Sequence, residues 1–87
     1  MQYQTQFRGI VPDGETRTWF TFGWPSNELV LWGVLPIAAV SSARVSLDRV
    51  DIEHDGNTNT YYLTVSNDGS GYVIFDAVYV TIPGTLA

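Results

Sequence analysis

The alternation of apolar and polar residues along this chain predicts β-strands almost throughout. Within Tyr61–Ser66, the side chains of Tyr61, Leu63 and Val65 share one face of an extended chain, as in a half-buried strand. The following residues, Asn67–Gly71, tolerate positive φ or hydrogen-bond their own backbone, so we expect the chain to reverse there.

Two segments, Tyr72–Ile82 and Glu28–Leu35, are apolar at nearly every position. A strand that is apolar on both faces is typical of the centre of a sheet, where both faces are covered. We therefore predict two central strands, the second ending at Pro36, because proline cannot donate to a neighbouring strand. Gly33 indicates a bulge or a close backbone approach, and Pro36–Ser42 is expected to be a connector.

The N-terminal segment Gln2–Arg8 alternates strictly. Its polar row of glutamines suggests an edge strand that could pair with another chain. The residues that would carry this pairing are Gln2, Gln4 and Gln6. A turn is predicted after it at Pro12–Gly14, where proline presets φ and glycine accepts an unusual one.

The segment Thr16–Trp24 also alternates, but both of its faces carry aromatic residues. If Phe20 and Phe22 point into the core, Trp19 lies beside Arg17 on the outer face. A tryptophan in that position would be open to a ligand.

The segment Arg44–His54 contains a change of alternation. Val45 and Leu47 are apolar at odd positions, whereas Val50 and Ile52 are apolar at even positions. One uninterrupted strand cannot bury both pairs, so a bulge or kink is predicted near Asp48–Arg49.

The chain thus has six predicted strands, or seven if Arg44–His54 is divided. Turns recur every 8–12 residues or so, and no helical periodicity is visible. We expect all 87 residues to form a single all-β domain, an antiparallel Ig-like β-sandwich.

Composition narrows the classes of partner. Only 15% of the residues are charged, none is lysine, and three Trp, five Tyr and four Phe are present. Lysine commonly keeps sheet edges apart, so its absence favours burial of apolar surface against a partner, most simply another copy. The net charge of −5 argues against nucleic acid, and no apolar run is long enough for a membrane-spanning helix. The N-terminal region lacks the apolar core of a secretory signal, and without cysteine there is no thiol chemistry.

The run TYYLTVSNDGSGYVIFDAVYV, from Thr60 to Val80, resembles a strand pair of Ig-like sandwich modules in bacterial surface proteins. Those modules, the conserved-repeat and CARDB-type domains, share the pattern Y-x-L-x-V-x-N-x-G-S. The resemblance covers about a quarter of the chain and implies a mostly extracellular, non-catalytic module. The segments WFTFGWP and LVLWGVLP do not match the usual opening of those modules.

Catalytic chemistry has few candidates. His54 is the only histidine, and no nucleophile-elbow motif accompanies it. Asp76 interrupts an apolar strand, and a buried carboxylate needs a partner, for which Arg44 or Arg49 is available. We expect a structural ion pair and no enzymatic activity.

The candidates for a metal site are Asp55, Asn57 and Asn59, which repeat the start of a calcium loop. The loop pattern then fails, because Thr60 replaces its glycine and Ser66 replaces its bidentate glutamate. A solvated hairpin is the simpler interpretation, and no cofactor is expected.

Aromatic residues are the remaining candidates for contact with a partner or ligand. They are Trp19, Trp24, Trp32, Tyr62 and Tyr79. Rings of this kind bury large areas with few rotatable bonds, so they suit either a protein partner or a sugar. We expect a non-catalytic interaction module that self-associates through a low-charge apolar face or an edge strand. The alternative is a carbohydrate-binding module that uses exposed Trp and Tyr.

Overall fold

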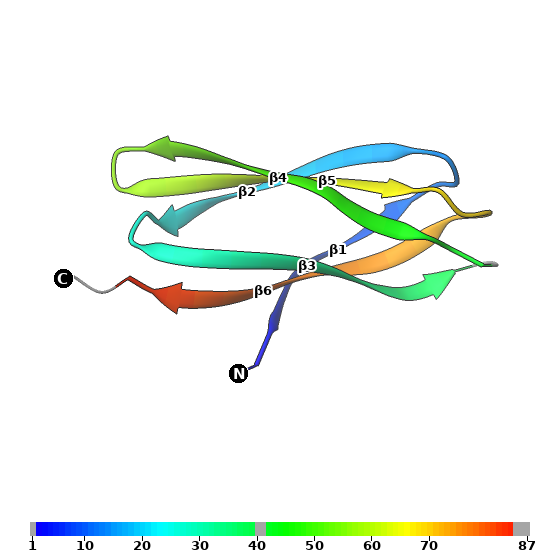
Figure 1. Ribbon diagram of the computed structural model, residues 1–87, viewed down its shortest axis with the longest axis horizontal. Helices are drawn as coiled ribbons and strands as arrows, with labels where there is room; N and C mark the ends of the chain where they lie inside the picture. Colours follow the sequence, from blue (N-terminus) through cyan, green and yellow to red (C-terminus); the bar gives the residue numbers. More distant parts are fainter. Residues whose placement is uncertain (1, 40–41, 85–87) are drawn as a thin grey trace.

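A computed structural model describes residues 2–39 and 42–84 of the chain. All its regular structure is β-strand, and the described residues contain no helix. The six antiparallel strands are β1 (Gln4–Val11), β2 (Thr16–Pro25), β3 (Glu28–Ala39), β4 (Val45–Asp55), β5 (Thr58–Asn67) and β6 (Val73–Pro83) (Figure 1). The predicted all-β class is thus confirmed, with six strands rather than seven.

The strands form two three-stranded sheets that lie one above the other (Figure 1). Sheet A has the order β1-β6-β3, and sheet B has the order β2-β5-β4. The core between them takes Tyr61, Leu63 and Val65 from β5 and Phe75 and Ala77 from β6, all essentially buried. The face predicted for Tyr61, Leu63 and Val65 is confirmed.

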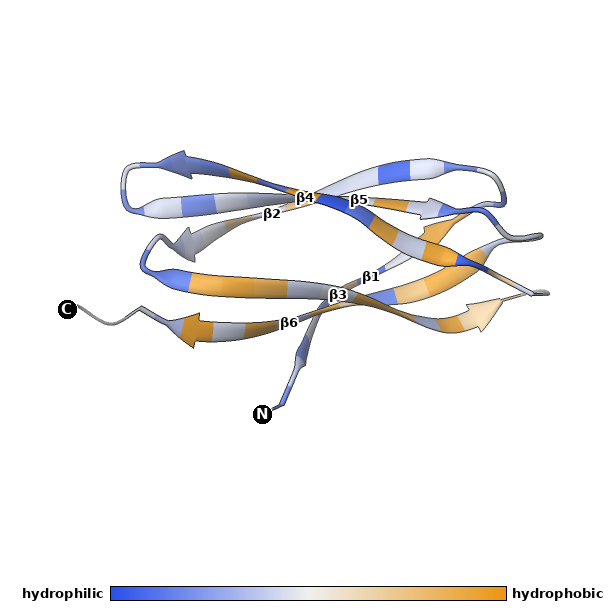
Figure 2. Ribbon diagram, in the orientation of Figure 1, coloured by the Kyte–Doolittle hydropathy of each residue, from blue (hydrophilic) through white to orange (hydrophobic). Residues whose placement is uncertain are grey.

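The two apolar segments have different places in sheet A. β6 is central, as predicted, but β3 is an edge strand, so its predicted central position is wrong. β3 also continues through Pro36 to Ala39, where a connector was predicted; Val40 and Ser41 of that connector lie outside the described residues. Proline is tolerated because an edge strand has one side that needs no donor. In Figure 2 the apolar colour follows both β3 and β6.

Each of the four edge strands carries a bulge. The residues without a one-to-one partner are Gln6 in β1, Phe22 and Gly23 in β2, Ile37 in β3 and Asp48 in β4. A bulge shifts the alternation by one residue, so side chains beyond it change face. The bulge predicted near Asp48–Arg49 is confirmed, and it lets Leu47 and Val50 face the same side, opposite Val65 and Leu63. The other three bulges were not predicted at these positions.

Asn67 ties the two sheets together at one end of the core. Its buried side-chain amide donates to the carbonyls of Val11, at 3.1 Å, and Gly71, at 2.8 Å. Its Oδ1 accepts a hydrogen bond from the Gly69 amide at 2.9 Å. These bonds close the predicted turn after β5, in which Gly71 has a φ of 85°.

Candidate functional site

The outer face of sheet A is largely apolar, and we call its apolar residues the apolar face. Directly opposed residues share a face of a sheet, and the pairs Leu29–Ile82 and Leu31–Val80 point away from the core. The apolar face consists of Ile10, Leu29, Leu31, Leu35, Ile74, Val78, Val80 and Ile82. We predicted that β3 and β6 are covered on both faces. Within residues 2–39 and 42–84 no element packs over this one, and Leu31 is 49% exposed.

A single glycine shapes the middle of the apolar face. Gly33 lies opposite Val78, and a Cβ placed on it would meet Val78 Cγ2 at 3.5 Å. Val78 is 9% exposed but does not belong to the buried core cluster. Val78 therefore contributes little exposed surface to the apolar face, and Gly33 adds no side chain beside it.

One ion pair interrupts the apolar face. Arg8 Nε donates to Asp76 Oδ1 at 2.8 Å, with the Asp76 side chain 16% exposed and that of Arg8 64% exposed. The hydrogen bond from Arg8 holds the pKa of Asp76 below its ordinary value, against the effect of desolvation. The predicted structural ion pair is thus present, but its partner is Arg8 rather than Arg44 or Arg49. Arg49 instead donates to Asp51 at 2.8 Å.

The tryptophans lie between the sheets. Trp24 packs edge-on against Trp32 and Tyr79, with ring centroids 5.6 and 5.0 Å apart, and Trp32 also contacts Tyr61. These rings fill one end of the interior. Of the five aromatic contact candidates, only Tyr62 points from an outer face.

Trp19 fills the other end of the interior with Phe7 and Phe75, at centroid distances of 6.0 and 5.1 Å. Trp19 was predicted to lie outside if Phe20 and Phe22 point into the core. That condition is not met, because Phe20 and Phe22 face solvent with 63% and 74% of their surface exposed. The bulge after Thr21 then returns Trp24 to the inside. Gly23, with a φ of 83°, is the signal in the sequence that could have located this bulge.

The glutamines of β1 are engaged within the chain. Tyr79 Oη donates to Gln4 Oε1 at 2.9 Å, and Gln6 Nε2 donates to Thr21 Oγ1 at 3.2 Å. The edge position predicted for this strand is confirmed, although Gln2 precedes the strand itself. The bulge at Gln6 breaks the strict alternation, so Gln4 and Phe7 both lie on the inner side.

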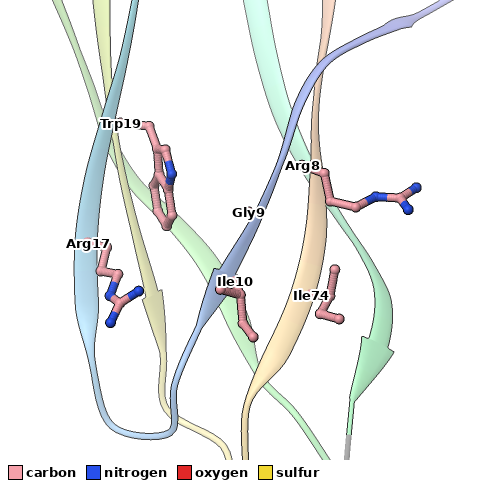
Figure 3. A pocket seen from close by; sticks show the side chains of 6 residues that line it. All are labelled: Arg8, Gly9, Ile10, Arg17, Trp19 and Ile74. Carbon is pink, nitrogen blue, oxygen red and sulfur yellow. The ribbon is translucent and has the colours of Figure 1, made fainter.

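A shallow hollow of about 390 Å³ lies along β1, the edge strand of sheet A, where β1 is flanked by β2 and β6 (Figure 3). It is lined by Arg8, Gly9, Ile10, Arg17, Trp19 and Ile74. Its two guanidinium groups already have carboxylate partners, since Arg8 pairs with Asp76 and Arg17 with Glu15 at 3.3 Å. In Figure 3 the Arg8 side chain points away from Trp19, so the cations do not converge on one ligand position.

The outer face of sheet B carries the exposed aromatic residues. Phe20 lies opposite Tyr62 with ring centroids 6.0 Å apart, and Phe22 lies 6.3 Å from Phe20. Tyr62 Oη donates to Glu53 Oε1 at 3.2 Å, and the nearby Glu53 charge raises the Tyr62 pKa above its ordinary value. Sequence reasoning did not name Phe20 and Phe22 as contact residues, because it considered them only as residues that could point into the core.

The remaining candidates lie at the β4–β5 hairpin. His54 Nδ1 and Asn59 Oδ1 are 3.0 Å apart and share a hydrogen bond across this hairpin. Asp55 and Asn57 flank its glycine, Gly56, with a φ of 66°. Among the described residues no three His, Asp or Glu side chains gather closely enough to hold a metal ion.

Comparisons with protein-family models, with curated proteins and with solved structures find no match for this chain. In the part of the chain that the structure describes, no helix could cross a membrane. Because the comparisons give no relative, the function is argued from the outer faces of the two sheets.

Proposed function

We propose that this protein is a non-catalytic interaction module, built as an Ig-like β-sandwich, that self-associates through the apolar face. The observation that carries the proposal is the largely apolar surface over β3 and β6, the two most apolar strands of the chain, which the Arg8–Asp76 pair interrupts at one point. Contiguous apolar patches of this kind mark interaction surfaces in soluble proteins.

Strand order supports the Ig-like assignment. In an Ig-type sandwich, strands B, E and D are neighbours in one sheet, and strands C and F are neighbours in the other. The order β2-β5-β4 matches the first arrangement, and β3 beside β6 matches the second. β1 takes the position beside β6 that the last strand of an Ig domain occupies. The partial resemblance of Thr60–Val80 to Ig-like surface modules agrees with this assignment.

A second copy is the occupant that fits the apolar face best. Three strands about 4.8 Å apart, each contributing about ten residues at about 3.3 Å, span roughly 450–500 Å². Two such faces would bury about 1,000 Å² in total, near the lower limit for a specific interface. We therefore expect a dimer of moderate affinity, formed by packing sheet A on sheet A across a twofold axis.

Charge does not oppose this contact, although the chain as a whole carries −5. The Arg8–Asp76 pair is neutral in sum, so two apolar faces can meet without bringing a net like charge together. Edge pairing is less favoured, because every edge strand carries a bulge that disturbs its free row of backbone groups.

Sedimentation velocity over a range from about 1 μM to 1 mM tests the proposal. The wild type should shift from monomer to dimer, and Leu31→Glu should remain monomeric because it places a charge at the centre of the contact. Thr64→Glu is the matched control: it adds the same charge on the outer face of sheet B and should dimerise like the wild type. A wild type that stays monomeric at the highest concentration would disprove self-association.

A further inference from the structure

A second surface, on the opposite side of the molecule, has a different chemistry. On the outer face of sheet B, Phe20, Tyr62 and Asp51 form one cross-strand row from β2 to β4. In the adjacent part of the face, Phe22 follows Phe20 along β2, and Glu53 lies opposite Thr60. We call Phe20, Phe22, Tyr62, Asp51 and Glu53 the aromatic–acidic strip.

The aromatic half of the strip is unusually open. Phe20 and Phe22 are among the most exposed large apolar side chains that the structure describes. The rings of Phe20, Phe22 and Tyr62 are tilted by only 31–34° between neighbours, so together they present one broad surface. Trp19, which precedes Phe20, and Thr21, which lies between the two phenylalanines, face the core. Phe20 and Phe22 point the other way, so packing of the interior does not explain why they are phenylalanines. Exposed rings of this kind are typical of contact surfaces.

The acidic half of the strip is provided by β4. This strand contains four carboxylates, at Asp48, Asp51, Glu53 and Asp55, and one guanidinium, at Arg49, which gives four negative charges against one positive. Arg49 donates to Asp51, whereas Glu53 accepts from the neutral phenol of Tyr62 at 3.2 Å and has no cationic partner among the described residues. The strip therefore keeps net negative charge beside its rings.

We propose that the aromatic–acidic strip binds a cationic, arginine-bearing polypeptide segment. Neighbouring strands lie about 4.8 Å apart, so the carboxylates of β4 and the rings of β2 are separated by about 10 Å. An arginine side chain that lies over Tyr62 can place its guanidinium at Glu53 while the plane of the group stacks on a ring. Charge complementarity favours a cation over a neutral sugar, because a sugar can donate hydrogen bonds to the carboxylates but brings no positive charge to offset their desolvation.

The test is an NMR titration of the ¹⁵N-labelled protein with a hexa-arginine amide peptide as the probe. We expect saturable shifts confined to the amides of Phe20, Tyr62 and Glu53 and their neighbours, weakening several-fold between low and physiological salt. Glu53→Gln and Phe20→Ser should each weaken binding at least about threefold, because they remove the charge partner and the stacking partner respectively. Glu28→Gln is the control, since it removes the same charge at the start of β3 and should bind within about twofold of the wild type.

Three results would overturn the inference. Equal loss of affinity in Glu28→Gln and Glu53→Gln would show that the peptide responds only to net charge. Saturation of the strip by cellohexaose, with no response to hexa-arginine, would assign the strip to carbohydrate instead. Shifts of Phe20 and Tyr62 that depend on protein concentration alone would assign it to a second copy. The strip and the apolar face are on opposite sheets, so either proposal can fail without the other.

Discussion

Gly9 lies directly against the ring of Phe75: a Cβ added to Gly9 would come within 2.9 Å of two ring atoms of this fully buried side chain. The same atom would be 3.0 Å from the Trp19 ring. The edge strand β1 therefore closes on the core only because residue 9 has no side chain.

Gly9→Ala should destabilise the fold by about 1–3 kcal/mol, because the packed rings of Phe75 and Trp19 must move to admit a methyl group. Urea denaturation gives the measurement. Gly33→Ala is the matched control, since its Cβ would meet only Val78, at 3.5 Å, and little change in stability is expected. Equal midpoints for Gly9→Ala and the wild type would contradict this account of β1.

Asn67→Ala should lower the free energy of unfolding by about 2–4 kcal/mol, because it removes three hydrogen bonds and leaves buried backbone groups without partners. Asn67→Asp should also destabilise, since a carboxylate can accept from Gly69 but cannot donate to the carbonyls of Val11 and Gly71. Asn59→Ala, in the exposed hairpin, should cost much less in the same thermal or urea experiment. Similar losses at Asn59 and Asn67 would show that Asn67 does not join the sheets.

The Arg8–Asp76 pair predicts a dependence of stability on acid. Because the pKa of Asp76 is lowered in the folded state, its contribution is present above the ordinary Asp pKa of about 4 and is lost as the pH falls through the lower, folded value. The wild type should exceed Asp76→Asn in stability at pH 6, and this difference should shrink below about pH 4. Arg8→Gln should bring the Asp76 pKa, followed by carboxyl ¹³C NMR, back toward its ordinary value. An unchanged Asp76 pKa in Arg8→Gln would refute the pairing.

The contact between Tyr62 and Glu53 should make stability fall at high pH rather than at low pH. The Glu53 charge raises the folded pKa of Tyr62, so its contribution to stability is complete below the ordinary Tyr pKa of about 10 and is lost as the pH rises through the folded value. Glu53→Gln should lower the Tyr62 pKa, measured from the ¹³Cζ chemical shift. Glu28→Gln should leave the Tyr62 pKa unchanged. If Glu53→Gln also left the Tyr62 pKa unchanged, the contact between Tyr62 and Glu53 would be contradicted.

The two outer faces could be predicted only in part. The high apolar content of β3 and β6 predicted strands with no polar face, and the apolar face follows from that pattern. The aromatic–acidic strip was missed, because Thr16–Trp24 has aromatic residues on both sides and alternation cannot say which side faces inward. Gly9 also gave no signal, since its role depends on Phe75, which is far away in the sequence.

The sequence alone determined the β-strands, most of their turns, the buried side of β5 and the bulge at Asp48, because each depends on local alternation or on residues with special backbone preferences. Only the tertiary structure decided that β3 is an edge, that Arg8 is the partner of Asp76, and that Trp19 and Trp24 face inward while Phe20 and Phe22 face solvent. The physical reason is that alternation divides the side chains of a strand between two faces but does not determine which face is buried. Burial of one face is chosen by the neighbouring strands, and three unpredicted bulges changed that choice partway along β1, β2 and β3.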